Sequence, residues 1–195
     1  MSLARAVFLD RDGVLVDDVG PLVRSADVRV LPGVAEALSL LVTTGWKIVV
    51  ISNQTAVARG LASEHDIRAV QHHVEACLIE AGAPAFDDFL FCPHHPRATV
   101  PAYRVACACR KPQPGLIERA CVRHGIDPHR SVMIGDRPSD IVAGQRAGCR
   151  TVWVQTGRHR EAPIESATPF ATPAPDYTCA DLFDAVCWLG RSRAA

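Results

Sequence analysis

Short apolar runs alternate along the chain with longer stretches in which apolar residues recur at the spacing of an α-helix. The apolar runs predict buried strands at residues 6–9, 47–51, 89–91, 132–134 and 151–154. The longer stretches predict helices at residues 32–44, 64–81, 115–124, 140–147 and 181–189. Strands that alternate with helices are typical of a parallel sheet covered on both faces, so the pattern predicts an α/β fold.

Local signals mark where some of these elements begin and end. Ser63 is placed to cap the second predicted helix, and Gly125 is placed to end the third. Residues 161–175 carry four prolines, which predicts an extended connection at the surface. The chain has 195 residues, an ordinary length for one domain, so residues 1–195 are expected to form a single domain.

Composition and charge exclude several classes of function. Basic and acidic residues number 21 each, so the chain lacks the excess positive charge that holds nucleic acids or anionic membranes. Aromatic residues make up only 6% of the chain, which disfavours a surface on which bases stack. No apolar stretch approaches the roughly 20 residues that span a bilayer. We therefore expect a soluble, cytoplasmic protein with no nucleic-acid or membrane partner.

Polar residues follow the predicted strands at the points where the apolar runs stop. Asp10 and Asp12 come after the first strand, Ser52 after the second and Asp136 after the fourth, while Lys111 precedes a helix. An aspartate after a strand is usually a turn residue or a helix cap, but the carboxyl ends of parallel strands share one edge. Carboxylates gathered there need a cation, and their oxygens suit Mg²⁺. The serine and the lysine suit phosphate oxygens.

Eight cysteines raise the question of disulfides, and their distribution argues against them. Five lie singly in apolar patterns, where cysteine behaves as a small buried hydrophobe. The other three, Cys92, Cys107 and Cys109, cluster with His94 in an irregular segment at 92–109. In a cytosolic protein such a cluster favours a metal site over a disulfide framework.

The spacing of this cluster predicts structural zinc. Cys92 with His94, and Cys107 with Cys109, form two short chelating pairs. Three thiolates and one imidazole complete a tetrahedral Zn²⁺ shell and leave no open position for catalysis. The alternative is a set of unrelated buried cysteines, although an irregular loop of this length needs some ordering contact. His95 is a competing ligand; the pair spacing favours His94, and we expect His95 to face solvent or substrate.

The polar motifs and their order resemble those of the haloacid dehalogenase superfamily, from Asp-Arg-Asp-Gly at 10–13 to Gly-Asp at 135–136. The resemblance implies a Rossmann-like three-layer sandwich and phosphoryl transfer. It implies that Asp10 is the nucleophile, that Asp12 acts as acid and then base, and that Ser52 and Lys111 hold phosphoryl oxygens. It also implies Mg²⁺ bound by Asp10, the main-chain carbonyl of Asp12, and Asp136.

The intervals between the motifs predict an open site. Residues 13–46 hold little beyond one loop and one helix, and the interval from the second motif to the third holds a helix, a strand and the irregular segment at 92–109. Neither interval has room for the cap domain that many superfamily members insert. The site is then walled by the zinc loop and by residues 17–24. Asp140 either orients the metal site or caps the next helix, and the sequence leaves both roles open.

The zinc loop followed by Arg-Lys-Pro narrows the resemblance to the heptose 1,7-bisphosphate phosphatases and the related histidinol-phosphate phosphatases. The length of the loop favours the heptose branch, with a sugar phosphate as substrate and histidinol phosphate as the alternative. A zinc-binding module without catalysis is a third interpretation, which the intact motifs disfavour. The residues expected to bind substrate beside Ser52 and Lys111 are Asn53, Gln54, Arg110 and Arg137. Val16 and Pro21 depart from the heptose pattern, which commonly has Asn and Tyr nearby.

Overall fold

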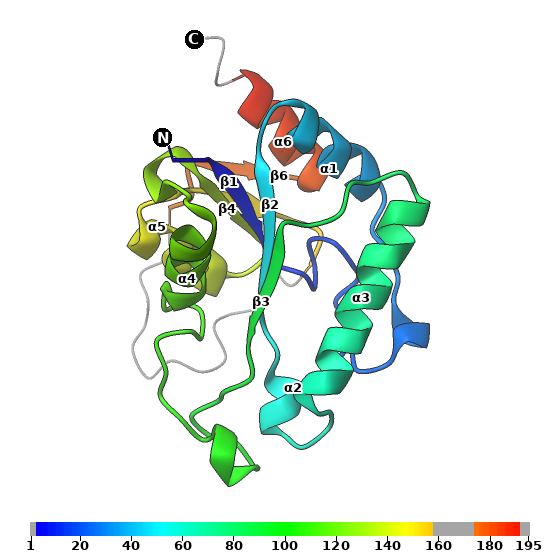
Figure 1. The fold of residues 1–195 in the computed structure, drawn as a ribbon, viewed down its shortest axis with the longest axis vertical. Coiled ribbons are helices and arrows are strands. Elements are labelled where there is room, and N and C mark those ends of the chain that lie inside the picture. The colour runs from blue at the N-terminus through cyan, green and yellow to red at the C-terminus, as the bar shows by residue number, and fades with distance from the viewer. Residues whose placement is uncertain (1–2, 158–173, 192–195) are drawn as a thin grey trace.

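The computed structural model describes residues 3–157 and 174–191. Six parallel strands form one sheet in the order β3-β2-β1-β4-β5-β6 (Figure 1). The strands are β1 (Ala6–Leu9), β2 (Lys47–Asn53), β3 (Asp88–Cys92), β4 (Val132–Gly135), β5 (Arg150–Val154) and β6 (Tyr177–Cys179). The predicted α/β fold with a parallel sheet is therefore confirmed.

Helices cover both faces of the sheet. Their bounds are α1 (Val34–Thr43), α2 (Thr55–Ala58), α3 (Glu64–Glu80), α4 (Gly115–His124), α5 (Pro138–Ala147) and α6 (Leu182–Arg191), with 3-10 turns η1 (Ser25–Asp27), η2 (Pro101–Tyr103) and η3 (Pro128–Arg130). Helices α1, α3 and α6 share one hydrophobic core with the sheet, whereas α4 and α5 share another. Figure 1 shows the two groups on opposite sides of the strands, which gives three layers.

The central strands are buried because both of their faces are covered. Successive side chains of a strand point to opposite faces, so Val7 and Leu9 of β1 join the core under α1, α3 and α6. Ala6 and Phe8, which alternate with them, join the core under α4 and α5. All residues of β1 and β4 are buried, which explains their apolar runs.

The start of α3 and the end of α4 are formed by the local contacts that the sequence predicts. Ser63 caps α3, since its side chain accepts a hydrogen bond from the Asp66 amide while the Asp66 carboxylate accepts one from the Ser63 amide. Helix α4 ends at Gly125, whose φ of 61° lies in the left-handed region that favours glycine. Helix α5 begins at Pro138, two residues before the predicted start.

Two short elements escape the sequence prediction. Helix α2 is a single turn, and β6 has three residues at the edge of the sheet, so neither is long enough to show a hydrophobic period. Strand β6 is ordered by its pairing with β5, which is a tertiary contact. The proline-rich connection predicted at 161–175 lies outside the described residues except for Ala174 and Pro175.

The parallel sheet brings the ends of its strands to one edge. Strands β1, β2, β3 and β4 all run toward the edge where α2 and the zinc loop lie, at the bottom of Figure 1. The described segment between β1 and β2 contains only η1, α1 and loops, so no cap domain is inserted there. The predicted site residues that follow these strands therefore meet at this edge, and the described segment between β1 and β2 folds no domain over it.

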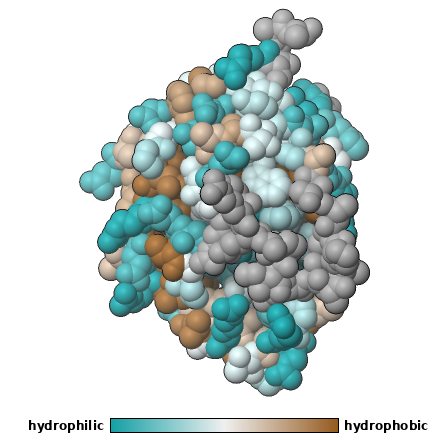
Figure 2. All heavy atoms as spheres, turned by 180° about the vertical axis from the view of Figure 1, so that it is seen from behind, coloured by the Kyte–Doolittle hydropathy of each residue, from teal (hydrophilic) through white to brown (hydrophobic). Residues whose placement is uncertain are grey.

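The outer surface carries mixed side chains. In the view from behind, hydrophobic residues gather mainly on the left of the picture, with hydrophilic ones between them (Figure 2). Within the described ranges, no helix combines the length and the apolar character that a membrane span requires. Most buried apolar side chains fill the two cores on either side of the sheet and a smaller cluster around α2, whereas Leu61 and Val122 are among the large apolar residues that stay exposed.

Candidate active site and metal centre

Three buried aspartates meet at the ends of β1 and β4. Asp10 follows β1, Asp136 follows β4, and Asp140 lies in the first turn of α5. Each offers a carboxylate oxygen, and these oxygens lie within 4.8 Å of one another. Carboxylates this close repel one another unless positive charge lies among them. Oxygen donors in this arrangement fit a hard divalent cation such as Mg²⁺, as the sequence predicts for Asp10 and Asp136.

Lys111 brings positive charge to these aspartates. Its side chain is buried, with Nζ 3.0 Å from Asp10 Oδ1 and 2.7 Å from Asp140 Oδ1. The ammonium also donates a hydrogen bond to the carbonyl of Ile51 at 3.0 Å. Burial alone would lower the pKa of Lys111, but the two carboxylates outweigh that effect and raise it. The lysine is therefore held as a cation beside the predicted nucleophile.

The sequence leaves open whether Asp140 orients the metal site or caps the next helix, and the structure shows the cap together with a contact to Lys111. Its carboxylate accepts a hydrogen bond from the Arg137 amide at 3.0 Å, which caps the start of α5. The same carboxylate pairs with Lys111. Burial raises the pKa of Asp140 to about 6, with Lys111 acting against this rise and Asp10 adding to it. Asp140 thus caps a helix and also fixes the position of the buried lysine.

The glycine of the first motif is required by the backbone. Gly13 has a φ of 85°, which side chains disfavour, and a Cβ there would lie 2.6 Å from Asp136 Oδ2. Only glycine lets the loop after β1 approach the loop after β4 this closely. The Asp-Arg-Asp-Gly motif and the Gly-Asp motif, far apart in sequence, are thereby brought into contact.

Asp12, the predicted acid and base, accepts hydrogen bonds from two buried neighbours. Arg11 donates from Nε to Oδ1 and from Nη2 to Oδ2, each at 2.9 Å. Gln54 donates from Nε2 to Oδ2 at 2.9 Å. Burial raises the pKa of Asp12, while the charge of Arg11 opposes the rise and that of Asp10 adds to it.

Arg11 has no predicted role, although its position between two aspartates already indicates one. An arginine between two aspartates in a buried motif requires a carboxylate partner, because an unpaired charge is costly to bury. The structure places the Arg11 side chain fully inside the protein and pairs it with Asp12. Which of the two aspartates is the partner depends on side-chain directions that the sequence does not show.

The residues at the end of β2 lie beside both Asp12 and Lys111. Ser52 Oγ accepts a hydrogen bond from Gln54 Nε2 at 2.9 Å. Asn53 donates from Nδ2 to the Lys111 carbonyl at 3.0 Å and accepts from the Lys111 amide at 3.1 Å. These bonds hold the Lys111 backbone against β2. Contact of Ser52, Asn53 and Gln54 with a substrate stays a prediction.

Two arginines predicted to bind substrate lie at the border of the site. Arg110 is partly buried and donates from Nη1 to the His94 carbonyl at 3.3 Å, so it is joined to the zinc loop. Arg137 Nη2 lies 2.6 Å from Asp18 Oδ2, within the segment 17–24 that was expected to wall the site. Arg137 therefore joins this wall to the start of α5. Substrate contact by either arginine stays a prediction.

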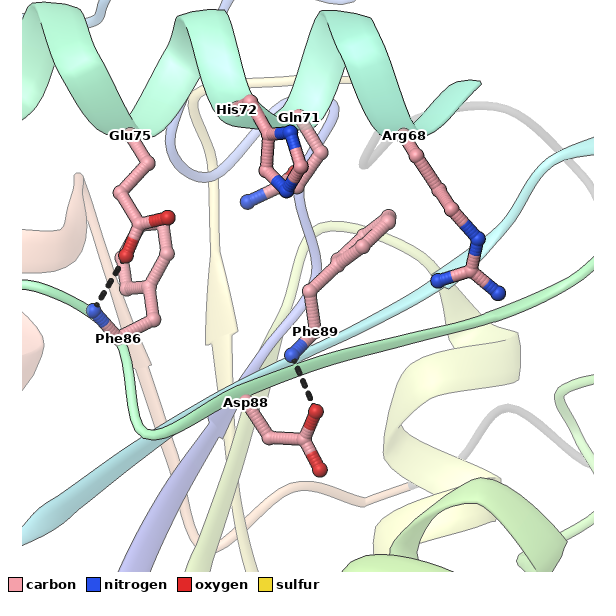
Figure 3. Close-up of a pocket in the computed structure, with 7 residues that line it drawn as sticks. All are labelled: Arg68, Gln71, His72, Glu75, Phe86, Asp88 and Phe89. Carbon is pink, nitrogen blue, oxygen red and sulfur yellow. Dashed lines mark hydrogen bonds between the residues drawn. The ribbon is translucent and has the colours of Figure 1, made fainter. Parts of the chain in front are cut away.

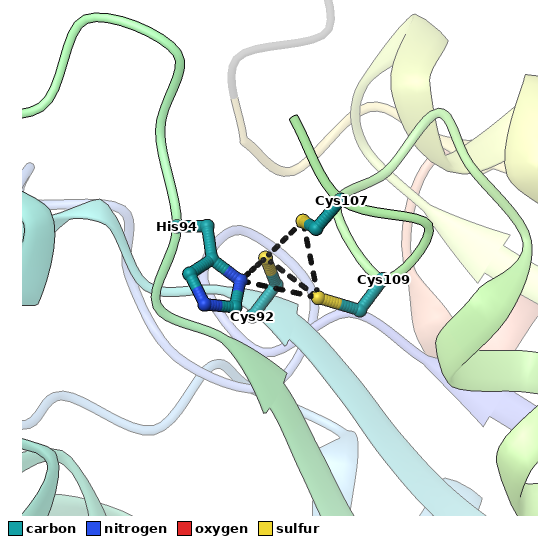
Figure 4. Close-up of side chains that lie close together, drawn as sticks. All are labelled: Cys92, His94, Cys107 and Cys109. Carbon is teal, nitrogen blue, oxygen red and sulfur yellow. Dashed lines mark hydrogen bonds between the residues drawn. The ribbon is translucent and has the colours of Figure 1, made fainter. Parts of the chain in front are cut away.

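The predicted zinc ligands form a compact cluster, shown in Figure 4. The Cys109 Sγ lies 3.2 Å from the sulfur atoms of Cys92 and Cys107 and 3.5 Å from His94 Nδ1. The Cys92 Sγ lies 3.5 Å from Cys107 Sγ and 3.7 Å from His94 Nδ1. Zn–S bonds of about 2.3 Å separate tetrahedral ligands by roughly 3.8 Å, so the donor set fits zinc.

The other cysteine predictions can be checked against the same structure. All eight cysteines are free, as expected for a chain without a disulfide framework. His94 faces the sulfur atoms, whereas His95 is 5% exposed and accepts a hydrogen bond from the Arg97 amide. His95 therefore does not face solvent, because the loop folds over it, and its place near the substrate stays a prediction.

The sequence and the fold are similar to those of known phosphatases. The family HAD-hydrolase-like, the haloacid-dehalogenase-like hydrolases, matches residues 108–185. The D-glycero-D-manno-heptose-1,7-bisphosphate 7-phosphatase of Thermosynechococcus vestitus is 37% identical over 187 residues, which cover 94% of each chain. The D-glycero-beta-D-manno-heptose-1,7-bisphosphate 7-phosphatase of Rhodopseudomonas palustris is 43% identical over 73% of this chain and 79% of its own. The chain belongs to this phosphatase family.

A solved structure supports the assignment to the heptose-bisphosphate phosphatase family. The D,D-heptose 1,7-bisphosphate phosphatase of B. bronchiseptica, complexed with magnesium and phosphate, superimposes with a TM-score of 0.81 and 30% identity. The match covers 96% of this chain and 99% of that one. Membership in the family makes the chain a phosphoric monoester hydrolase with the haloacid-dehalogenase fold.

A pocket of about 230 Å³ lies beside α3, apart from the predicted catalytic motifs (Figure 3). Its lining residues are Arg68, Gln71, His72, Glu75, Phe86, Asp88 and Phe89. Its two carboxylates are engaged by the chain itself, since Glu75 accepts from the Phe86 amide and Asp88 from the Phe89 amide. None of the predicted site residues lines it.

Proposed function

We propose that the chain is a Mg²⁺-dependent phosphatase that removes the 7-phosphate from D-glycero-D-manno-heptose 1,7-bisphosphate. The observation that carries the proposal is the meeting of Asp10, Asp136 and Lys111 at one edge of the sheet, in a chain related to phosphatases of that name. A phosphate ester brings negative charge, and a divalent cation with a buried lysine offsets it.

The reaction would proceed in two displacements. A carboxylate oxygen of Asp10 attacks phosphorus, the ester P–O bond breaks, and the departing sugar oxygen takes a proton from Asp12. Water then attacks the phosphoryl group and gives its proton to Asp12. The P–O bond to Asp10 breaks, which releases inorganic phosphate and restores the Asp10 carboxylate. Lys111 and Ser52 would hold phosphoryl oxygens in both steps.

Two metal ions fit the donor sets of this chain. Asp10, Asp136 and the carbonyl of Asp12 would hold Mg²⁺, which when bound neutralises charge on the phosphoryl group. Cys92, His94, Cys107 and Cys109 would hold Zn²⁺ in a closed shell that leaves no place for water, so this ion is assigned a structural role.

Recognition of the sugar is assigned to the border of the site. Arg110 follows the zinc ligand Cys109 directly and is partly buried, so zinc would set where its guanidinium lies. A guanidinium suits a second phosphate or the hydroxyls of an extended sugar. Lys111, the next residue, points instead to Asp10. Neighbouring cations would thus serve the distal and the reacting parts of one substrate.

A substrate panel tests this proposal. The panel contains both anomers of the heptose bisphosphate, a small sugar phosphate and histidinol phosphate. We expect Mg²⁺-dependent phosphate release to be fastest with one of the two heptose bisphosphate anomers. Phosphate release is measured as initial rate against substrate concentration. A preference for histidinol phosphate would overturn the heptose assignment, and no turnover of any ester with Mg²⁺ would overturn the phosphatase itself.

Replacing Arg110 by alanine is expected to raise the KM for the bisphosphate about tenfold or more, while a small monophosphate is affected much less. The difference arises because Arg110 is assigned to the distal part of the substrate. Arg104→Ala removes an exposed arginine from the same loop and serves as the control for net charge. Equal losses on both substrates would reject the distal role of Arg110.

A further inference from the structure

Gln54 occupies a junction between two catalytic groups. It is 4% exposed, and its Nε2 donates to Asp12 Oδ2 and to Ser52 Oγ, both at 2.9 Å. One nitrogen thus joins the predicted acid and base to the predicted phosphate-binding hydroxyl. Lys111 reaches Asp10 and Asp140 instead, so this junction is separate from the buried lysine.

The chemistry of the partners determines the orientation of this amide. An ionised carboxylate only accepts hydrogen bonds, so the nitrogen of Gln54, and not its oxygen, must face Asp12. The same nitrogen then donates to Ser52, which leaves the Ser52 O–H as a donor for another acceptor. A phosphoryl oxygen needs such a donor. The bond from Gln54 therefore leaves the Ser52 hydroxyl proton available for a phosphoryl oxygen.

The same contacts hold the Asp12 carboxylate from two sides. Arg11 lies close to both oxygens, with Nε 2.9 Å from Oδ1 and Nη2 2.9 Å from each of Oδ1 and Oδ2. Gln54 adds a donor to Oδ2 alone. Without Gln54 the carboxylate would be held by Arg11 only, and its orientation toward the departing sugar oxygen would be less fixed.

We propose that Gln54 is a positioning residue that holds Asp12 and Ser52 in one frame, so that Asp12 is oriented to give its proton to the leaving oxygen. This role rests on the proposed phosphatase function, and it acts on the step in which the sugar oxygen departs. An alkoxide leaving group is strongly basic and depends on the acid, whereas a phenolate with electron-withdrawing substituents departs with little help. Loss of Gln54 should therefore be felt unequally by the two kinds of ester.

Gln54→Met tests the proposal, since methionine keeps a similar length and removes both donated bonds. We expect kcat/KM for an alkyl sugar phosphate to fall on the order of 10²-fold, and that for p-nitrophenyl phosphate by about tenfold or less. The matched control is Gln71→Met, at an equally buried glutamine whose amide has no hydrogen-bond partner among the described residues. In the control, kcat/KM for each of the two esters should stay near the wild-type value.

The outcomes separate this role from the function it rests on. A Gln54→Met protein that melts like wild type and loses equally on both esters, or loses nothing, would overturn the positioning role while the phosphatase stands. If that variant fails to fold, Gln54→Leu also removes the donor toward Asp12, without adding charge, and should give the same unequal loss. A wild-type chain inactive on both esters with Mg²⁺ would reject the proposed function, and this role with it.

Discussion

Replacing Asp10 by asparagine is expected to lower kcat on the order of 10⁴-fold or more, because an amide oxygen cannot serve as the nucleophile that accepts phosphorus. The Asp10 carboxylate also pairs with Lys111 at 3.0 Å, so the substitution removes one of the charges that hold the lysine. Steady-state phosphate release by purified Asp10→Asn measures the effect. Substantial turnover would reject an aspartyl-phosphate mechanism.

Two further variants make that result specific. Asp12→Asn keeps the nucleophile and removes the acid, so we expect severe slowing with inorganic phosphate binding largely retained. Asp184→Asn, at an exposed position on α6, makes the same chemical change away from the site and should leave kcat as in wild type. If the exposed control lost as much activity as Asp10→Asn, the loss would reflect damage to the protein in general.

Replacing Cys107 by alanine is expected to remove tightly held zinc and to lower activity on the order of 10²-fold, even where the protein stays folded. Cys107 and Cys109 join the loop to Cys92 on β3, and Lys111 lies two residues after Cys109. A shift of about 1 Å in a positioning group can cost 10²-fold in rate. Elemental analysis, a thermal melt and kcat/KM are measured on the same preparation.

Cys121→Ala is the matched control for the zinc prediction. Cys121 is a partly buried cysteine of α4 outside the cluster, and burial raises the pKa of its thiol to about 11. This variant should keep about one zinc per chain and near wild-type activity. Wild-type protein without zinc, together with a Cys107→Ala protein that is stable and active, would show that the four side chains do not act through a metal.

The parts of the site that follow from strand topology could be predicted from the sequence. Asp10, Ser52 and Asp136 each end an apolar run, and parallel strands necessarily bring such ends to one edge. The meeting of Cys92, His94, Cys107 and Cys109 could be predicted because two short pairs have the spacing and chemistry of a tetrahedral metal shell. Ser63 could be assigned as a cap because its contact is local to α3.

The rest depends on side-chain directions and on contacts between distant segments. The pairing of Arg11 with Asp12, and the bridge from Gln54 to Ser52, involve rotamers that no periodicity encodes. The burial of His95 results from the folding of the zinc loop, which carries no regular pattern. Strand β6 was missed for a related reason, since a strand of three residues is ordered by its neighbour.

The most direct test of the account follows both phosphates of one substrate. D-glycero-D-manno-heptose 1,7-bisphosphate is incubated with the enzyme and Mg²⁺, and ³¹P NMR records the two phosphate resonances and free phosphate over time. The account predicts that the 7-phosphate resonance disappears as inorganic phosphate grows, that the 1-phosphate persists, and that a chelator of Mg²⁺ stops the reaction. Loss of the 1-phosphate instead, or an unchanged spectrum under conditions where the same preparation hydrolyses histidinol phosphate, would contradict it.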